Sequence, residues 1–173
     1  MIIKALVENT SISKDFGCEH GLSLYIETGD RKILFDVGAS ELFLENAKKL
    51  GVDVSDVDYL VISHGHYDHG GGLRAFLREN KKAEVFLHPL ALEQHYALRS
   101  DDTMEQIGLE GELKENRQIV LTSERFFIGK GVQVFSNVPQ RQPLPLSNSG
   151  LLMELKGQMV EDDFAHEQNL IIE

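Results

Sequence analysis

The sequence predicts an α/β fold of the layered α+β kind, in which helices pack on a sheet. Three observations support this fold class: strand-like runs alternate with helix-like periods, one strand-like run is apolar throughout, and a histidine cluster follows that run directly. With 173 residues, of which 42% are apolar and 26% charged, the chain has an ordinary globular composition. We therefore expect a single domain over residues 1–173.

The N-terminal part of the chain predicts a small antiparallel sheet. Residues 2–7, 22–27 and 32–35 read as strands, and the turn-like segment Thr28-Gly29-Asp30-Arg31 separates the last two. A helix is predicted to begin at Ser40, because three apolar residues follow at i, i+4 and i+7 and Gly51 is placed to end it. These apolar residues are Phe43, Ala47 and Leu50.

Two further strands and a helix are expected around the histidine cluster. Residues 58–63 contain the apolar run Tyr59-Leu60-Val61-Ile62, which is typical of a strand buried on both faces. A second amphipathic helix carries Leu73, Phe76 and Leu77, and residues 84–87 form the next strand. The alternation of strand and helix in this part of the chain is what predicts the layered fold.

The rest of the chain is predicted to be less regular. Residues 91–116 read as a polar helix followed by a mobile excursion that could serve as a lid, and His95 within it is expected to be solvated. Prolines confine residues 140–149 to an extended loop. Four more strands are expected, at residues 119–122, 132–136, 151–155 and 169–172.

Three histidines and an aspartate fall within the six residues His64-Gly65-His66-Tyr67-Asp68-His69. Such a string arises by chance in on the order of one shuffled sequence in a thousand. It follows a buried strand and precedes a glycine-rich turn into a helix, which is where open α/β sheets place ligands. Imidazole and carboxylate suit divalent metals, with zinc the leading candidate and iron or manganese the alternatives.

Four donors this close together cannot all reach one ion, because successive side chains point in different directions. We therefore expect two divalent ions, one held by His64 and His66 and the other by Asp68 and His69. A hydroxide held between the ions would be the nucleophile, and Asp68, the catalytic candidate, would orient it.

Residues 60–73 resemble the signature segment of the metallo-β-lactamase superfamily, and Ile33-Leu34-Phe35-Asp36-Val37-Gly38 resembles its earlier Asp-x-Gly strand. The resemblance implies an αββα sandwich, of which this chain would form the N-terminal half plus the start of the second sheet. It also implies that Asp36 supports the metal ligands. Residues 19–23, 86–89 and 165–170 resemble one branch, which includes dihydropterin ribofuranosylaminobenzene phosphate synthases and metal-dependent hydrolases. His20, His88 and His166 are further candidates to support a ligand, and the first two to face the substrate.

The resemblance also implies that ligands are missing. A catalytic zinc ordinarily has three protein ligands, and the family takes the others from a Gly-Cys-x-His-like segment and a later histidine, neither of which this sequence contains. We therefore expect a C-terminally incomplete domain. An expression fragment, a frameshifted gene and a split enzyme with a complementing C-terminal half stay open. An uncovered sheet edge would favour a homo-oligomer.

The expected function is hydrolysis of a small molecule through a metal-bound hydroxide. The alternatives are a pterin-linked transferase of the same branch and an inactive binding fragment with an incomplete metal shell. A formal net charge of −11 argues against nucleic acid as a partner, and a nuclease-like activity therefore ranks last. No apolar run approaches the ~20 residues of a membrane span and no signal peptide is recognisable, so we expect no membrane partner and a cytoplasmic location.

Overall fold

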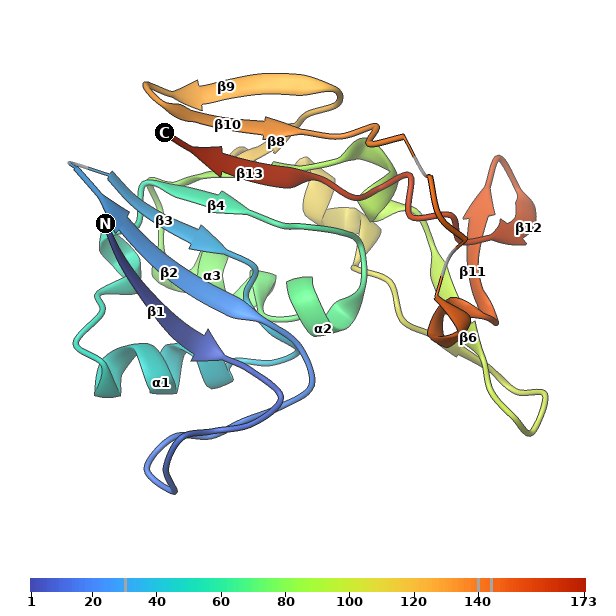
Figure 1. The fold of residues 1–173 in the computed structure, drawn as a ribbon, viewed down its shortest axis with the longest axis horizontal. Coiled ribbons are helices and arrows are strands. Elements are labelled where there is room, and N and C mark those ends of the chain that lie inside the picture. The colour runs from blue at the N-terminus through green and yellow to red at the C-terminus, as the bar shows by residue number, and fades with distance from the viewer. Residues whose placement is uncertain (30, 140, 144) are drawn as a thin grey trace.

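The computed structural model describes residues 1–29, 31–139, 141–143 and 145–173. Its largest element is a six-stranded sheet in the order β1-β2-β3-β4-β5-β8 (Figure 1). The first three strands pair antiparallel, whereas β3, β4, β5 and β8 run parallel. The strands are β1 Ile2–Val7, β2 Ser23–Thr28, β3 Arg31–Phe35, β4 Tyr59–Val61, β5 Glu84–Leu87 and β8 Ile119–Leu121.

The helices cover one face of this sheet, which is the lower face in Figure 1. They are α1 Leu42–Lys49, α2 Tyr67–Gly70 and α3 Leu73–Glu79, and the short 3-10 turns are η1 Val54–Asp56, η2 Pro89–Leu92, η3 Gly111–Glu115 and η4 Leu146–Asn148. Phe43 of α1 and Phe76 of α3 are fully buried against Leu34 and Leu60 of the sheet. This apolar layer is the main core of the protein.

A three-stranded antiparallel sheet in the order β13-β10-β9 packs on the opposite face. Its strands are β9 Arg125–Gly129, β10 Val132–Phe135 and β13 Asn169–Ile172. Ile33 and Val61 face it, because neighbouring residues on a strand point to opposite faces and Leu34 and Leu60 already face the helices. Helices, large sheet and second sheet thus confirm the predicted sandwich.

A third, four-stranded antiparallel sheet in the order β12-β11-β6-β7 lies beyond the end of the first two. Its strands are β6 His95–Leu98, β7 Met104–Gln106, β11 Leu151–Leu155 and β12 Gln158–Glu161. The prediction for residues 91–116 was therefore wrong. They contribute two strands, and Ala97, Ile107 and Leu109 are buried. Their alternation of buried and exposed residues is short and was masked by polar neighbours.

The other predicted elements agree with the structure to within one or two residues, whereas strands β9 and β12 were not predicted. Asp30 of the predicted turn, and Gln140 and Leu144 of the predicted loop, lie outside the described residues. Across the described part of the chain, no helix is both long enough and apolar enough to cross a membrane.

Candidate metal centre

The histidine cluster begins directly after β4 and turns into α2, at the edge where parallel strands end. Because β3 and β4 are parallel and Phe35 pairs with Val61, the residues after these two strands meet at the same edge. Asp36 follows β3, and Ser63 and His64 follow β4. This register is what places Asp36 beside the cluster.

Asp36 connects the residues at this edge through its hydrogen bonds to Ser63 and His69. Its side chain is fully buried, and its backbone adopts the left-handed region with φ of 61°. One oxygen accepts the main-chain N–H of Ser63 at 2.6 Å, and the other accepts the Ser63 hydroxyl at 2.7 Å and lies 2.7 Å from His69 Nδ1. A carboxylate with this many hydrogen bonds is held in one orientation.

His69, which contacts Asp36, and the neighbouring His64 have opposite protonation behaviour. Burial disfavours a charge on His69, but hydrogen bonds to Asp36 and Asp68 outweigh it and raise the pKa of His69 to about 9. Burial, together with neighbouring His69 and His66, lowers the pKa of His64 to about 2. His64 is therefore neutral and has a lone pair available for a metal ion.

His64, Asp68 and His69 form the first group of side chains that could hold a metal ion. Their ligand atoms lie within 4.8 Å of one another. Asp68 Oδ2 lies 3.4 Å from His69 Nε2 and 3.4 Å from Nε2 of the largely exposed His20. His64 and His69 line a cavity of about 900 Å³, so this group is open to a small molecule.

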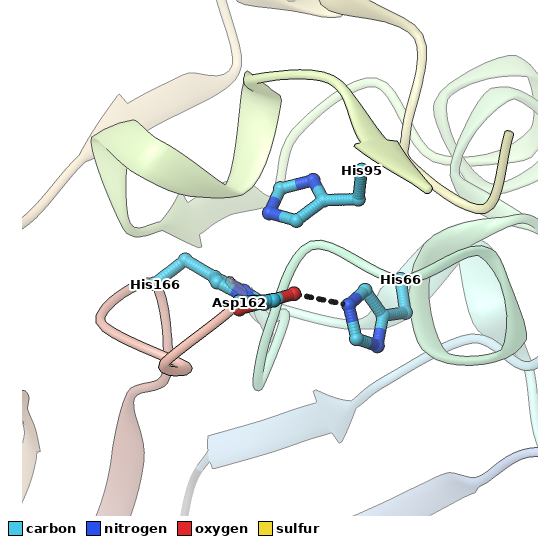
Figure 2. A group of neighbouring side chains, drawn as sticks. All are labelled: His66, His95, Asp162 and His166. Atoms are coloured by element: carbon cyan, nitrogen blue, oxygen red, sulfur yellow. Dashed lines mark hydrogen bonds and ion pairs between the residues drawn. The ribbon is translucent and has the colours of Figure 1, made fainter. Parts of the chain in front are cut away.

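His66, His95, Asp162 and His166 form the second group, shown in Figure 2. Their potential ligand atoms also lie within 4.8 Å of one another, and all four residues are buried. Asp162 Oδ2 lies 2.9 Å from His66 Nε2, and Asp162 Oδ1 lies 3.0 Å from His166 Nε2. Burial opposes the charge on Asp162, but the hydrogen bonds from His166 and His66 hold its pKa well below its usual range.

The prediction that His95 is solvated was wrong. His95 lies on β6, is fully buried, and has no hydrogen-bond partner for either ring nitrogen among the described residues. Burial, assisted by His166, lowers the pKa of His95 to about 4, so the ring is neutral. The sequence signal for its burial is weak, since only Ala97 repeats the inward-facing position on this short strand.

The structure distributes the predicted ligands over both groups. His64, Asp68 and His69 share one group, whereas His66 belongs to the other. The rings of His64 and His66 are nevertheless adjacent, with centroids 4.8 Å apart. His88 lies in neither group, is buried, and its side chain accepts the Leu90 N–H at 3.3 Å at the start of η2. Sequence reasoning did not single out Asp162.

Two glycines allow the chain to approach the cluster closely. Gly21 has φ of 132°, and a Cβ atom there would lie 1.9 Å from the Asp68 carbonyl oxygen. A Cβ atom on Gly65 would lie 2.5 Å from the Ala91 carbonyl oxygen and 2.9 Å from His95 Cε1. Both positions therefore require glycine for steric reasons.

Comparisons with known proteins agree with this architecture. The family model described as the metallo-beta-lactamase superfamily matches residues 16–145. The crystal structure of Tm1679, described as a metal-dependent hydrolase of the beta-lactamase superfamily, superposes with a TM-score of 0.80 and 31% identity. That match covers 98% of this chain and 60% of the other chain.

Two proteins of Methanocaldococcus jannaschii are also similar. An uncharacterized protein is 30% identical over 98% of this chain and 65% of its own length. The 7,8-dihydropterin-6-methyl-4-(beta-D-ribofuranosyl)-aminobenzene-5'-phosphate synthase is 36% identical over 47% of this chain and 30% of its own length. The chain thus spans 65% of the length of the uncharacterized M. jannaschii protein and 60% of the length of the Tm1679 chain, the two relatives that match almost all of it.

Proposed function

Because the chain belongs to the metallo-beta-lactamase superfamily, we propose that it is a metal-dependent hydrolase acting on a small molecule. The observation that carries this proposal is the first group, in which His64, Asp68 and His69 converge beside a cavity of about 900 Å³. Cavities of this size are typical of small-molecule sites. The hydrolase description of the structural neighbour Tm1679 supports the same reaction class.

The donors fit divalent metal ions. His69 Nδ1 is engaged by Asp36, which leaves His69 Nε2 to face Asp68 and the cavity. A histidine whose second nitrogen bonds a carboxylate is the usual form of a metal ligand. Imidazoles and a carboxylate without thiolate suit zinc, with iron and manganese as alternatives. We propose two ions, with His66 completing the donor set of the motif.

A divalent ion held here by His64, Asp68 and His69 would supply Lewis acidity, which polarises the oxygen of a scissile bond and lowers the pKa of water. The residues of the chain do the rest. Asp36 and Ser63, both buried, fix the ring of His69 through their hydrogen bonds. Asp68 is only 15% exposed and lies between His69 and His20, where its carboxylate can orient water and accept a proton at Oδ2.

The lining of the cavity favours an uncharged or cationic substrate. Leu22, Phe35 and Phe164 provide apolar surface, and Asp163 and Glu167 add negative charge. Among the lining residues that the structure describes there is no lysine or arginine, which phosphate recognition ordinarily uses. This supports hydrolysis of a neutral ester, amide or lactone-type bond over a reaction on a phosphorylated substrate.

A pterin-linked transferase is the second candidate function. Its support is the 36% identity with the M. jannaschii synthase, which is confined to 88 residues. The name of that synthase specifies a phosphate. The acidic lining of the cavity in this chain disfavours a phosphorylated substrate and therefore this second function.

Paired assays of the zinc-supplemented chain test the proposal. Neutral esters and lactones are compared with the matching phosphate monoesters, and we expect kcat/KM to favour the neutral compounds. The His64→Ala variant should lose activity by on the order of 100-fold or more, because a ligand is removed. Equal activity of wild type and variant, or activity on phosphate esters alone, would contradict the proposal.

A further inference from the structure

The loop between β12 and β13 carries two side chains that reach the histidine motif from far along the sequence. Asp162 and His166 are both fully buried and lie outside residues 16–145, the part of the chain that the family match covers. Asp162 contacts His66, and His166 contacts Gly65. The same loop therefore contacts two consecutive residues of the motif, and Figure 2 shows the contact of Asp162 with His66.

The hydrogen bonds fix the tautomer of His166. The main-chain N–H of Gly65 donates to His166 Nδ1 at 2.8 Å. A neutral imidazole has one protonated and one unprotonated nitrogen, so an accepting Nδ1 requires the proton to be on Nε2. His166 Nε2 therefore donates to Asp162, whose Oδ1 lies 3.0 Å away.

The contact with Asp162 likewise fixes which nitrogen of His66 carries a proton. An ionised carboxylate only accepts hydrogen bonds, and Asp162 Oδ2 lies 2.9 Å from His66 Nε2. His66 Nε2 is therefore a protonated nitrogen that donates to Asp162. Asp162 Oδ1 also accepts the main-chain N–H of Phe164 at 2.9 Å, which holds the carboxylate in place.

We propose that Asp162 is a positioning residue for the metal centre, held by His166, and that it engages His66 Nε2 so that this nitrogen is not the one that binds an ion. The inference rests on the proposed function, since it concerns the same metal centre. Asp36 does the same for His69 with the opposite nitrogen, because it engages Nδ1 and leaves Nε2 free. The two histidines are thus oriented by two buried carboxylates from separate parts of the chain.

The second group is better explained by hydrogen bonds that run from Gly65 through His166 and Asp162 to His66 than by a metal ion bound inside it. His166 Nδ1 accepts a hydrogen bond from Gly65, so its Nε2 carries a proton and offers no lone pair to an ion. His66 Nε2 also carries a proton, which it donates to Asp162, so it too offers no lone pair to an ion in this group. Only His95 has two nitrogens without a partner among the described residues, and one imidazole does not make a metal site.

Nitrogen-15 NMR of the histidine-labelled full chain tests the inference without a mutation. In the zinc-bound wild type we expect His66 to stay protonated at Nε2, because this nitrogen donates to Asp162. The opposite assignment, with zinc at Nε2, would overturn the inference and leave the proposed function intact. A wild-type chain that takes up no zinc would overturn the proposed function, and this inference with it.

Zinc titration of matched variants provides the second test. The Asp162→Asn variant should bind zinc about 10–100-fold more weakly and show mixed His66 tautomers. Asp101→Asn is the control, because Asp101 also accepts a main-chain N–H two residues on, from Thr103, but is exposed. The His95→Phe variant should keep its zinc affinity. Loss of zinc in His95→Phe but not in His64→Ala would instead assign an ion to the buried group and overturn the inference.

Discussion

Asp36 Oδ2 lies 2.7 Å from His69 Nδ1, and this contact joins the residue after β3 to the last histidine of the motif. The two residues are 33 positions apart in sequence, and the parallel pairing of β3 with β4 brings them together. The fold thus provides a carboxylate that orients the ring of His69, one of the proposed metal ligands. The predictions below follow from this and from the corresponding contacts.

The Asp36→Asn variant should bind zinc about 10–100-fold more weakly than wild type. Asparagine tolerates the left-handed backbone of Asp36, so the change removes the charge without adding backbone strain. Competition titration with a chelator measures the affinity. Unchanged zinc affinity in a folded Asp36→Asn variant would show that His69 does not need this carboxylate.

The Gly21→Ala variant should lose both stability and zinc affinity. The added Cβ atom would lie 1.9 Å from the Asp68 carbonyl oxygen, so the segment that carries Asp68 must move. Gly51→Ala is the matched control, since Gly51 also has a positive φ but nothing within 4 Å of an added Cβ atom. The control should cost only about 1–2 kcal/mol of backbone strain. Thermal unfolding and zinc titration of both variants check this, and equal effects would contradict it.

His166→Phe and His95→Phe should have different effects on the free energy of unfolding. Removing His166 leaves the Gly65 N–H and the Asp162 carboxylate without this partner, which should cost about 2–5 kcal/mol. Replacing His95 removes two nitrogens that have no partner among the described residues, so the cost should be within about 1 kcal/mol. Urea unfolding measures both values. Comparable losses would show that His95 has a partner in solution.

Removal of metal should lower the thermal stability of the chain. An ion that binds only the folded state at a hundredfold excess over its Kd contributes about 2.7 kcal/mol. For a protein of this size that corresponds to a rise in Tm of roughly 5–10 °C. Calorimetry in the presence of a chelator and then of excess zinc measures the difference. An unchanged Tm would indicate that no ion is bound in the folded state.

The fold was largely predictable because its main strands have clear patterns. β4 is a continuous apolar run and β5 is bounded by turn residues, so both were expected at nearly their observed positions. β9 was not predicted, because its exposed residues, such as Phe127, follow no alternation that a single sequence reveals. Of the third sheet, β11 was predicted, whereas β6 and β7 were missed because they are short and lie among polar residues.

The site was only half predictable. The motif His64–His69 is local in sequence, and its ligand chemistry is readable from residue types alone. The contact of Asp162 with His66 spans 96 positions, and only the folded chain brings these residues together. The i, i+4 spacing of Asp162 and His166 was visible, but nothing in the sequence indicates what the pair faces.

The metal content of the purified 173-residue chain, measured by mass spectrometry after zinc supplementation, tests the central claim most directly. We predict about two zinc ions per wild-type chain, with at least one lost in His64→Ala and none lost in Asp101→Asn. Zinc near zero in the wild type, or equal zinc content in wild type and His64→Ala, would contradict the assignment of this motif as a metal centre.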